Sequence, residues 1–107
     1  MPRRLGITSL RILGAIRDGH AYGLDIVAHA GLASGTVYPT LGRLKRSGLV
    51  TATWEDQRQA ERQGRPRRRY YALSTEGARA LAEGASRIAQ VAAELGDVAG
   101  HAAGQAR

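Results

Sequence analysis

Apolar side chains recur at helical spacing near the start of the chain. The first stripe predicts an amphipathic helix that ends near residue 17, and it consists of Leu10, Ile12, Leu13 and Ile16. Thr8 and Ser9 are the candidate caps of this helix, because their hydroxyls can accept a hydrogen bond from a free backbone N–H. A second helix is predicted to follow residues 21–23, and Gly31 is placed to end it.

A third amphipathic helix is predicted from Ser34, its candidate cap, to Arg46. Its apolar stripe has spacings of four and three and consists of Val37, Leu41 and Leu44. Polar, aromatic and basic side chains are expected on its other faces; they are Thr36, Tyr38, Thr40, Arg43 and Arg46. The pattern therefore predicts one buried face and one outward face.

The hydrophobic pattern changes after the third helix, where β-branched residues replace the helical stripe. Residues 49–54 predict a short strand and residues 68–73 a second one. Residues 55–62 lack an apolar stripe and are expected to form a loop between them. A final helix is expected to begin at a cap formed by Ser74 or Thr75.

The final helix carries hydrophobic residues at heptad spacing, with small alanines alongside. The members of this seam are Leu81, Ile88, Val91, Leu95 and Val98. Such a seam suits close packing against another helix, and glycines in the segment would let it fray without one. We expect this helix to span residues 76–100 and the tail, residues 101–107, to be disordered.

Positive charge is concentrated in one stretch of the chain. Residues 43–69 hold eight arginines and one lysine against three acidic residues, a net +6 out of the +7 of the whole chain. An anionic partner is therefore expected. Nearly all of the basic residues are arginine, whose planar guanidinium suits bidentate contact with phosphate or guanine; a bias in composition is the alternative explanation.

Composition also excludes several kinds of site. The chain has no cysteine, so it has no disulfides or thiolate metal ligands. Its three histidines are scattered, and no metal or other cofactor is expected. No nucleophile–base pair, phosphate loop or paired carboxylates appear, which argues against an enzyme. No apolar run reaches the ~20 residues of a membrane span, and no signal-peptide pattern is present, so we expect a cytoplasmic protein without a membrane partner.

The predicted order of elements is typical of a helix-turn-helix DNA-binding domain followed by a hairpin. The third helix is the candidate reading helix, because a helix fits the major groove, where base edges can be distinguished. Its candidate DNA contacts are Ser34, Gly35, Thr36, Tyr38, Thr40, Arg43 and Arg46. Base preference is expected from Thr36, Thr40 and Arg43. Tyr38 either reaches a phosphate or packs against the second helix.

A run of arginines in and around the hairpin supports a nucleic-acid partner. The run consists of Arg62, Arg65, Arg67, Arg68 and Arg69. Arg65, Arg67 and Arg68 are the candidate contacts to the DNA backbone or minor groove, because Pro66 favours an extended segment and extended arginines can enter a narrow groove. A solvated run of charge is the alternative.

Three motifs occur in an order that resembles the PadR family of transcriptional regulators. They are GTVYP at residues 35–39, GRPR at residues 64–67 followed by two tyrosines, and LSTEG at residues 73–77. The resemblance covers about residues 5–82 and implies a winged helix-turn-helix fold in residues 1–75. It also implies a homodimer built through the C-terminal helix, so that the heptad seam becomes the dimer interface. It further implies binding to palindromic operator DNA, usually as a repressor, often released by a small aromatic or hydrophobic compound.

The expected fold is therefore mainly α with a small β-hairpin, a winged helix-turn-helix followed by a C-terminal dimerisation helix. Tyr70 and Tyr71 point to opposite faces of their strand, so one of them is expected in the core. Trp54 is expected in the core or at the base of the hairpin. The final helix has no aromatic residue, which disfavours an aromatic-sandwich ligand pocket there. A winged-helix module that binds an acidic protein is the alternative function.

Overall fold

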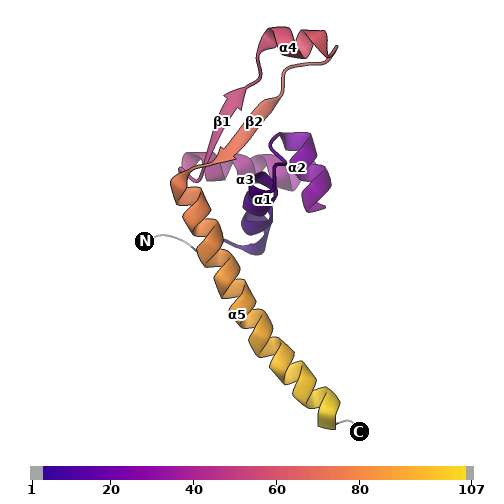
Figure 1. Cartoon of the computed structure of the whole chain (residues 1–107), viewed down its shortest axis with the longest axis vertical. Coiled ribbons are helices and arrows are strands. Elements are labelled where there is room, and N and C mark those ends of the chain that lie inside the picture. Colours follow the sequence, from indigo (N-terminus) through magenta and orange to yellow (C-terminus); the bar gives the residue numbers. More distant parts are fainter. Residues whose placement is uncertain (1–3, 106–107) are drawn as a thin grey trace.

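The computed structural model describes residues 4–105, and it describes the side chains of residues 4–96. Within this range the chain forms helices α1–α5 and strands β1 and β2 (Figure 1). Their bounds are Ile7–Arg17 for α1, Gly23–Ala30 for α2, Ser34–Arg46 for α3, Val50–Trp54 for β1, Gln57–Arg62 for α4, Arg69–Leu73 for β2 and Thr75–Gln105 for α5. The predicted fold class, mainly α with a small β-hairpin, is confirmed.

Three short helices form the body of the molecule, and two elements project from it (Figure 1). The hairpin extends to one side and carries α4 at its tip, while α5 runs out on the opposite side as a single long helix. The molecule is accordingly elongated, with extents of 64 × 34 × 21 Å. We call the hairpin together with α4 the wing (residues 50–73).

Helix α1 lies at the centre of the core, where it packs against α2, α3, β2 and α5. The most deeply buried apolar side chains are Ile12, Leu13, Ile26, Val37 and Leu41. The predicted stripes of the first and third helices are therefore confirmed, because each turns its apolar face toward this shared core.

The predicted caps of the first and third helices are wrong. Helix α1 begins after Gly6 and α3 begins after Ala33, so Thr8, Ser9 and Ser34 lie inside the helices rather than at their caps. Backbone carbonyls alone start both helices, as when the carbonyl of Ala33 accepts hydrogen bonds from the two N–H groups of residues 36 and 37. The core packing of the apolar stripes, rather than a polar cap, sets where these helices start.

The start of α5 is fastened to the start of the hairpin. The Ser74 hydroxyl accepts a hydrogen bond from the Gly77 N–H at 3.0 Å and donates one to the Gly48 carbonyl at 2.6 Å. The Ser74 N–H also donates to the Leu49 carbonyl at 3.1 Å. Gly77 permits this contact, because a Cβ there would lie only 1.8 Å from the Leu49 oxygen. The predicted cap at Ser74 is confirmed.

The wing is an antiparallel hairpin whose inner part is attached to the body. Its register pairs Val50 with Leu73 at the inner end and Trp54 with Arg69 at the outer end. The Tyr71 N–H donates to the carbonyl of Ala21 just before α2, at 2.7 Å. The Tyr71 side chain packs against the core, which confirms that one of the two tyrosines is a core residue.

Two predicted boundaries are wrong. Residues 57–62 form helix α4 instead of a loop, because the Gln57 side chain bonds that of Glu61 one turn later and Ala60 is buried. A single buried alanine gives no visible stripe, so the pattern alone could not show this helix. Helix α5 continues to Gln105 rather than ending near residue 100, and the last two residues of the predicted tail lie outside the described residues.

None of the helices in the described part of the chain is long and apolar enough to cross a membrane.

Candidate nucleic-acid interface

The outward face of α3 is polar and basic, as predicted. Its exposed side chains include Ser34, Thr36, Tyr38, Arg43, Lys45 and Arg46, with Gly35 exposed beside them. The helix contains no acidic residue. Its first turn is open to solvent at Gly35, where a Cβ would meet nothing within 4 Å. A phosphate could approach the free N–H groups of this turn, where the positive end of the helix dipole also attracts it.

Thr40 does not face outward, so its predicted position is wrong. Only 1% of the residue is exposed, and its hydroxyl donates to the Thr36 carbonyl at 2.7 Å. The same hydroxyl accepts a hydrogen bond from the Arg43 guanidinium at 3.0 Å. The spacing itself carried the signal, because position 40 lies between Val37 and Leu44 on the buried stripe. The hydroxyl of the buried Thr40 thus holds the Arg43 guanidinium in place.

Arg65 is held by an ion pair rather than being free on the wing. Its guanidinium donates to both oxygens of the Glu55 carboxylate, at 2.5 and 2.8 Å. The Glu55 side chain is only 4% exposed and accepts two more hydrogen bonds, from the Arg68 N–H and from the Tyr70 hydroxyl. These contacts lower the pKa of Glu55 to about 2, with the Arg65 hydrogen bonds as the main cause.

Through these hydrogen bonds, Glu55 at the end of β1 joins this strand to Arg65, Arg68 and Tyr70 on the returning side of the wing. Sequence reasoning missed Glu55, because its partner Arg65 lies ten residues away, beyond a helix that the pattern did not predict. The ion pair joins Arg65, which follows α4, to Glu55 at the end of β1, and the same carboxylate bonds the Arg68 N–H.

The next three arginines lie against aromatic rings. The Arg68 guanidinium lies 3.9 Å from the centre of the half-buried Tyr22 ring. Arg67 and Arg69 lie 5.1 and 5.5 Å from the centre of the Trp54 ring. Contacts of this kind are favourable and hold the guanidinium in place. Arg67 is exposed, whereas Arg68 is half-buried, so Arg67 is the more accessible of the two predicted contacts.

Trp54 is 55% exposed and lies in the outermost pair of the hairpin, so the prediction that it lies in the core or at the base of the hairpin is wrong. It shares a strand face with the buried Val50 but sits four residues further out, where no element of the body covers the hairpin. Trp54 instead provides a surface for Arg67 and Arg69.

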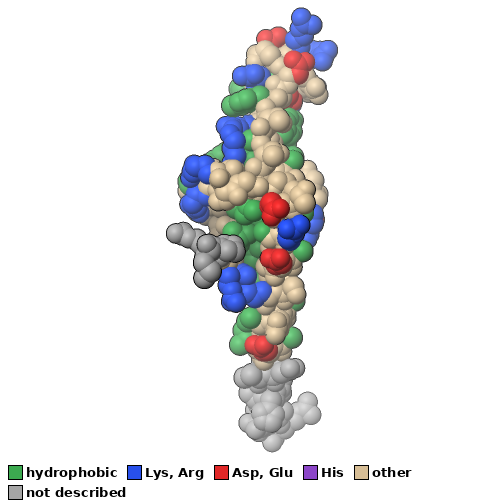
Figure 2. Space-filling view, turned by 90° about the vertical axis from the view of Figure 1, so that its left-hand side faces the viewer, with side chains coloured by type: hydrophobic (Ala, Val, Ile, Leu, Met, Phe, Trp, Pro, Cys, Tyr) green, Lys and Arg blue, Asp and Glu red, His purple; other side chains and the backbone are tan. Residues whose placement is uncertain are grey.

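Helix α4 adds basic residues that the sequence reasoning left out of the site. Arg58 and Arg62 are both exposed at the tip of the wing. Figure 2 shows lysine and arginine side chains at this tip, with some acidic ones, and on the flank of the body. The charge of the segment was visible in the sequence, but its placement on a helix was not.

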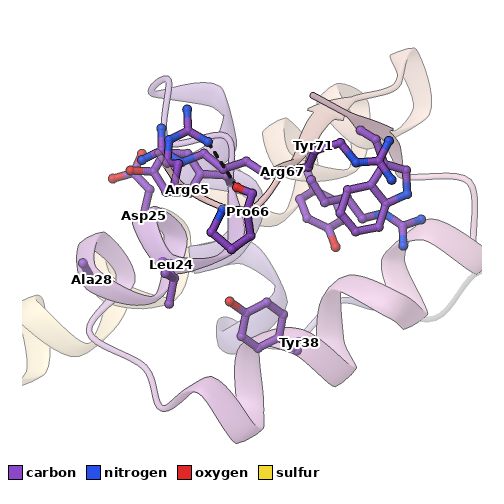
Figure 3. A pocket seen from close by; sticks show the side chains of 13 residues that line it. Leu24, Asp25, Ala28, Tyr38, Arg65, Pro66, Arg67 and Tyr71 are labelled. Carbon is purple, nitrogen blue, oxygen red and sulfur yellow. Dashed lines mark hydrogen bonds between the residues drawn. The ribbon is translucent and has the colours of Figure 1, made fainter. Parts of the chain in front are cut away.

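Tyr38 packs against the second helix, one of the two predicted alternatives. A Cβ on Gly23 would come within 2.4 Å of the Tyr38 ring, so glycine at the start of α2 makes room for it. The Tyr38 side chain rises from α3 toward Pro66 of the wing and lies beside Leu24 (Figure 3). It therefore connects α3 with α2.

The heptad seam divides between the core and the surface. Leu81 is 6% exposed and belongs to the core of its own chain, so its assignment to a dimer interface is wrong. Close packing of α5 on α1 causes this, because Gly84 leaves room for Leu10. Further along the helix the exposed members are Ile88, Val91 and Leu95. The side chain of Val98 lies outside the described residues.

Comparison with known proteins identifies the fold. The sequence profile of the transcriptional regulator PadR-like family matches residues 12–83. A PadR family transcription regulator from hypervirulent Clostridium difficile R20291 is 20% identical; the match covers 87% of this chain and 98% of that one, with a TM-score of 0.76. A PadR-like transcription factor from Bacteroides fragilis is 28% identical over 87% of this chain and 90% of that one, with a TM-score of 0.69.

A third solved structure is that of the Bordetella bronchiseptica protein BpsR, whose DNA binding is regulated by 6-hydroxynicotinic acid. It is 23% identical, covers 85% of this chain and 67% of its own, and has a TM-score of 0.64. No curated protein matches the sequence significantly. Family and fold are those of transcription regulators with a winged helix, not of enzymes. Because the family profile matches most of its length, this chain belongs to the PadR-like family of transcriptional regulators.

Proposed function

We propose that this protein is a repressor that binds a palindromic operator as a homodimer. The observation that carries the proposal is the outward face of α3, which presents three basic side chains and no acidic one beside an arginine-rich wing. A helix of this kind fits the major groove of DNA, and the wing can follow the adjacent backbone or minor groove.

Within this proposal the residues of α3 divide their tasks. Thr36 and Arg43 face base edges, and Thr40 holds the Arg43 guanidinium in place through its hydroxyl. Lys45 and Arg46 meet phosphates, as do the backbone N–H groups around Gly35. Sequence preference then arises from few side chains, while most of the affinity comes from charge.

The wing supplies a second set of contacts. Arg67 is its most accessible arginine near the body, and Arg58 and Arg62 extend the positive surface to the tip. Arg65 acts through its ion pair with Glu55 and does not itself touch DNA. This division replaces the expectation that Arg65 grips the backbone directly.

The exposed apolar residues of α5 are the proposed dimer contact. Ile88, Val91 and Leu95 are 38%, 45% and 63% exposed, which is unusual for large apolar residues that share one helix. Two copies of α5 that pack along these residues would place two reading helices on half-sites about one turn of DNA, ~34 Å, apart. Release by a small ligand is also part of the proposal, and the regulation of BpsR by an aromatic acid supports it.

The proposal is tested by mobility shift with DNA that flanks the protein's own gene, in which inverted repeats are the candidate operators. If the dimer neutralises six or more phosphates, affinity should fall about a thousandfold or more between 50 and 200 mM salt. Arg43→Ala should lower the preference for the operator over random DNA, whereas Arg79→Ala, which removes an exposed arginine from α5, should not. A flat salt response, or equal binding to DNA and polyglutamate, would instead favour the acidic-protein partner.

A further inference from the structure

Two adjoining cavities lie along the wing where it faces the body. The first, of about 590 Å³, is bordered by α2 and by residues 65–69 of the wing (Figure 3). The second, of about 400 Å³, lies between α3 and β2. Tyr38, Arg69 and Tyr71 line both cavities, so the two meet along these side chains. We call the two cavities together the wing groove.

The wing groove is strongly cationic. Asp25 is the one carboxylate among the described residues that line it, and His20 already contacts Asp25 at 3.0 Å. Arg65 is paired with Glu55. The remaining cations of the lining form no ion pair with any described side chain; they are Lys45, Arg46, Arg67, Arg68 and Arg69. Several uncompensated cations along one groove suit a chain of phosphates better than a single anionic group.

Aromatic and aliphatic side chains lie open among these cations. Trp54 of β1 and Tyr38 of α3 are 55% and 44% exposed, and Leu24 of α2 is 69% exposed. A DNA duplex keeps the faces of its bases inside its own stack, so it offers these rings no flat partner. Unpaired bases do offer their faces, and a cationic groove with exposed aromatic rings is typical of proteins that bind single strands.

One donor of the groove lining also has no acceptor. The Nε–H of Arg69 is shielded from solvent, and within the described residues it has no hydrogen-bond partner. Such unsatisfied donors are uncommon in folded proteins, because each one costs the free energy of its lost hydration. Arg69 borders both cavities, so a phosphate that draws its guanidinium toward the groove would give this donor a partner.

We propose that the wing groove binds single-stranded DNA, with unpaired bases against Trp54 and Tyr38 and with phosphates on the lysine and arginines of the lining. This activity is separate from the reading of a duplex by Arg43, which does not line the groove. The phosphate contacts proposed for the duplex include Arg67, which the groove shares. A single strand in the groove should therefore compete with operator duplex.

The contribution of the bases is tested with two oligomers of equal charge. The probe is an oligothymidylate of twelve nucleotides, and its control is an oligomer of the same length in which every site lacks its base. In fluorescence anisotropy the oligothymidylate should bind at least about tenfold more tightly, because stacking adds to a phosphate attraction that both share. It should also quench the emission of the single tryptophan, and the control should not. Equal affinity of the two oligomers, or of oligothymidylate and polyglutamate, would overturn the proposal, since charge alone would then explain binding.

A matched pair of variants locates the stacking surface. Trp54 is largely exposed, so Trp54→Leu and Trp54→Tyr should both fold, and only the second keeps an aromatic ring in the groove. Trp54→Leu should bind oligothymidylate about tenfold more weakly than the unaltered protein, and Trp54→Tyr should recover most of the affinity. Arg43→Ala, which removes a charge outside the lining, should change this affinity less than about twofold. Similar affinities for the two Trp54 variants would refute stacking on this ring.

Binding of single strands and binding of the operator can fail independently. A protein that binds oligothymidylate but no duplex keeps the groove and refutes the repressor. A protein that binds its operator but not oligothymidylate keeps the repressor and refutes the groove. If both bind, oligothymidylate should displace labelled operator duplex at concentrations at which the oligomer without bases displaces little. Failure of oligothymidylate to displace the duplex would place the single strand outside the wing groove.

Discussion

Gly77→Ala should destabilise the fold, although alanine is the better helix former. In an open helix position this change stabilises by up to about 1 kcal/mol. At Gly77 the new Cβ would lie 1.8 Å from the Leu49 carbonyl oxygen, which is a backbone atom and cannot rotate away. Carbon–oxygen contacts are comfortable at about 3.3 Å or more, so α5 and the hairpin would have to separate by roughly 1.5 Å.

That separation breaks the hydrogen bonds that join the two elements. Ser74 would lose its bonds to the carbonyls of Gly48 and Leu49, each worth about 1 kcal/mol. The buried contacts of Leu81 and Gly84 with α1 would loosen as well. Loss of two bonds and some packing outweighs the helix propensity of alanine, for a net cost of about 2 kcal/mol. For a chain of this length, that lowers Tm by roughly 10 °C.

Thermal unfolding followed by circular dichroism measures this effect. Gly96→Ala is the matched control, because it adds the same methyl to the same helix where nothing lies within 4 Å. The control should melt at the same temperature as the unaltered protein or a few degrees above it. If Gly77→Ala melts as high as Gly96→Ala, the close approach of α5 to Leu49 does not constrain the fold and the reasoning is refuted.

Three further predictions concern the wing, the reading helix and α5. The pKa of Glu55 is lowered from 4.5 to about 2, so its contribution to stability should be complete above pH 4.5 and should be lost as the pH falls toward 2; urea unfolding across this range should show a smaller acid sensitivity for Glu55→Gln. Thr40→Val should reduce the preference for operator over random DNA about three- to tenfold while Thr40→Ser retains it, because only serine keeps the hydroxyl that holds Arg43; equal ratios in a competition mobility shift would contradict this role. Ile88→Asp should yield monomers by light scattering, because it places a charge among the exposed apolar residues of α5, and a dimeric variant would show that another surface joins the chains.

The helices of the body could be predicted from the sequence, because their periodic apolar residues all face one core. The same periodicity placed Thr40 on the buried stripe, but its residue type suggested an outward role. A threonine can satisfy its hydroxyl on the carbonyl one turn earlier, as Thr40 does with Thr36, and so is easily buried. Spacing was therefore a better guide than polarity at this position.

The wing was harder to predict because contacts between distant residues determine it. Helix α4 has one buried side chain, and the ion pair of Glu55 with Arg65 forms only once α4 has turned the chain back. Trp54 looked like a core residue by type, but the hairpin extends beyond the body that would cover it. Leu81 had the spacing of the exposed seam yet lies where α5 still touches α1.

Helix α5 changes its surroundings between Gly84, which contacts Leu10 in the core, and Ile88, the first exposed member of the seam. One residue inserted between them would rotate the exposed apolar residues by about 100° and move them by about 1.5 Å, without altering a single buried contact nearer the start of the helix. The length of α5, and the direction in which it presents its exposed residues, can therefore change while the body of the molecule stays the same. Chains with this body could vary how two copies meet, and so the spacing of the DNA that they span, through helix length alone.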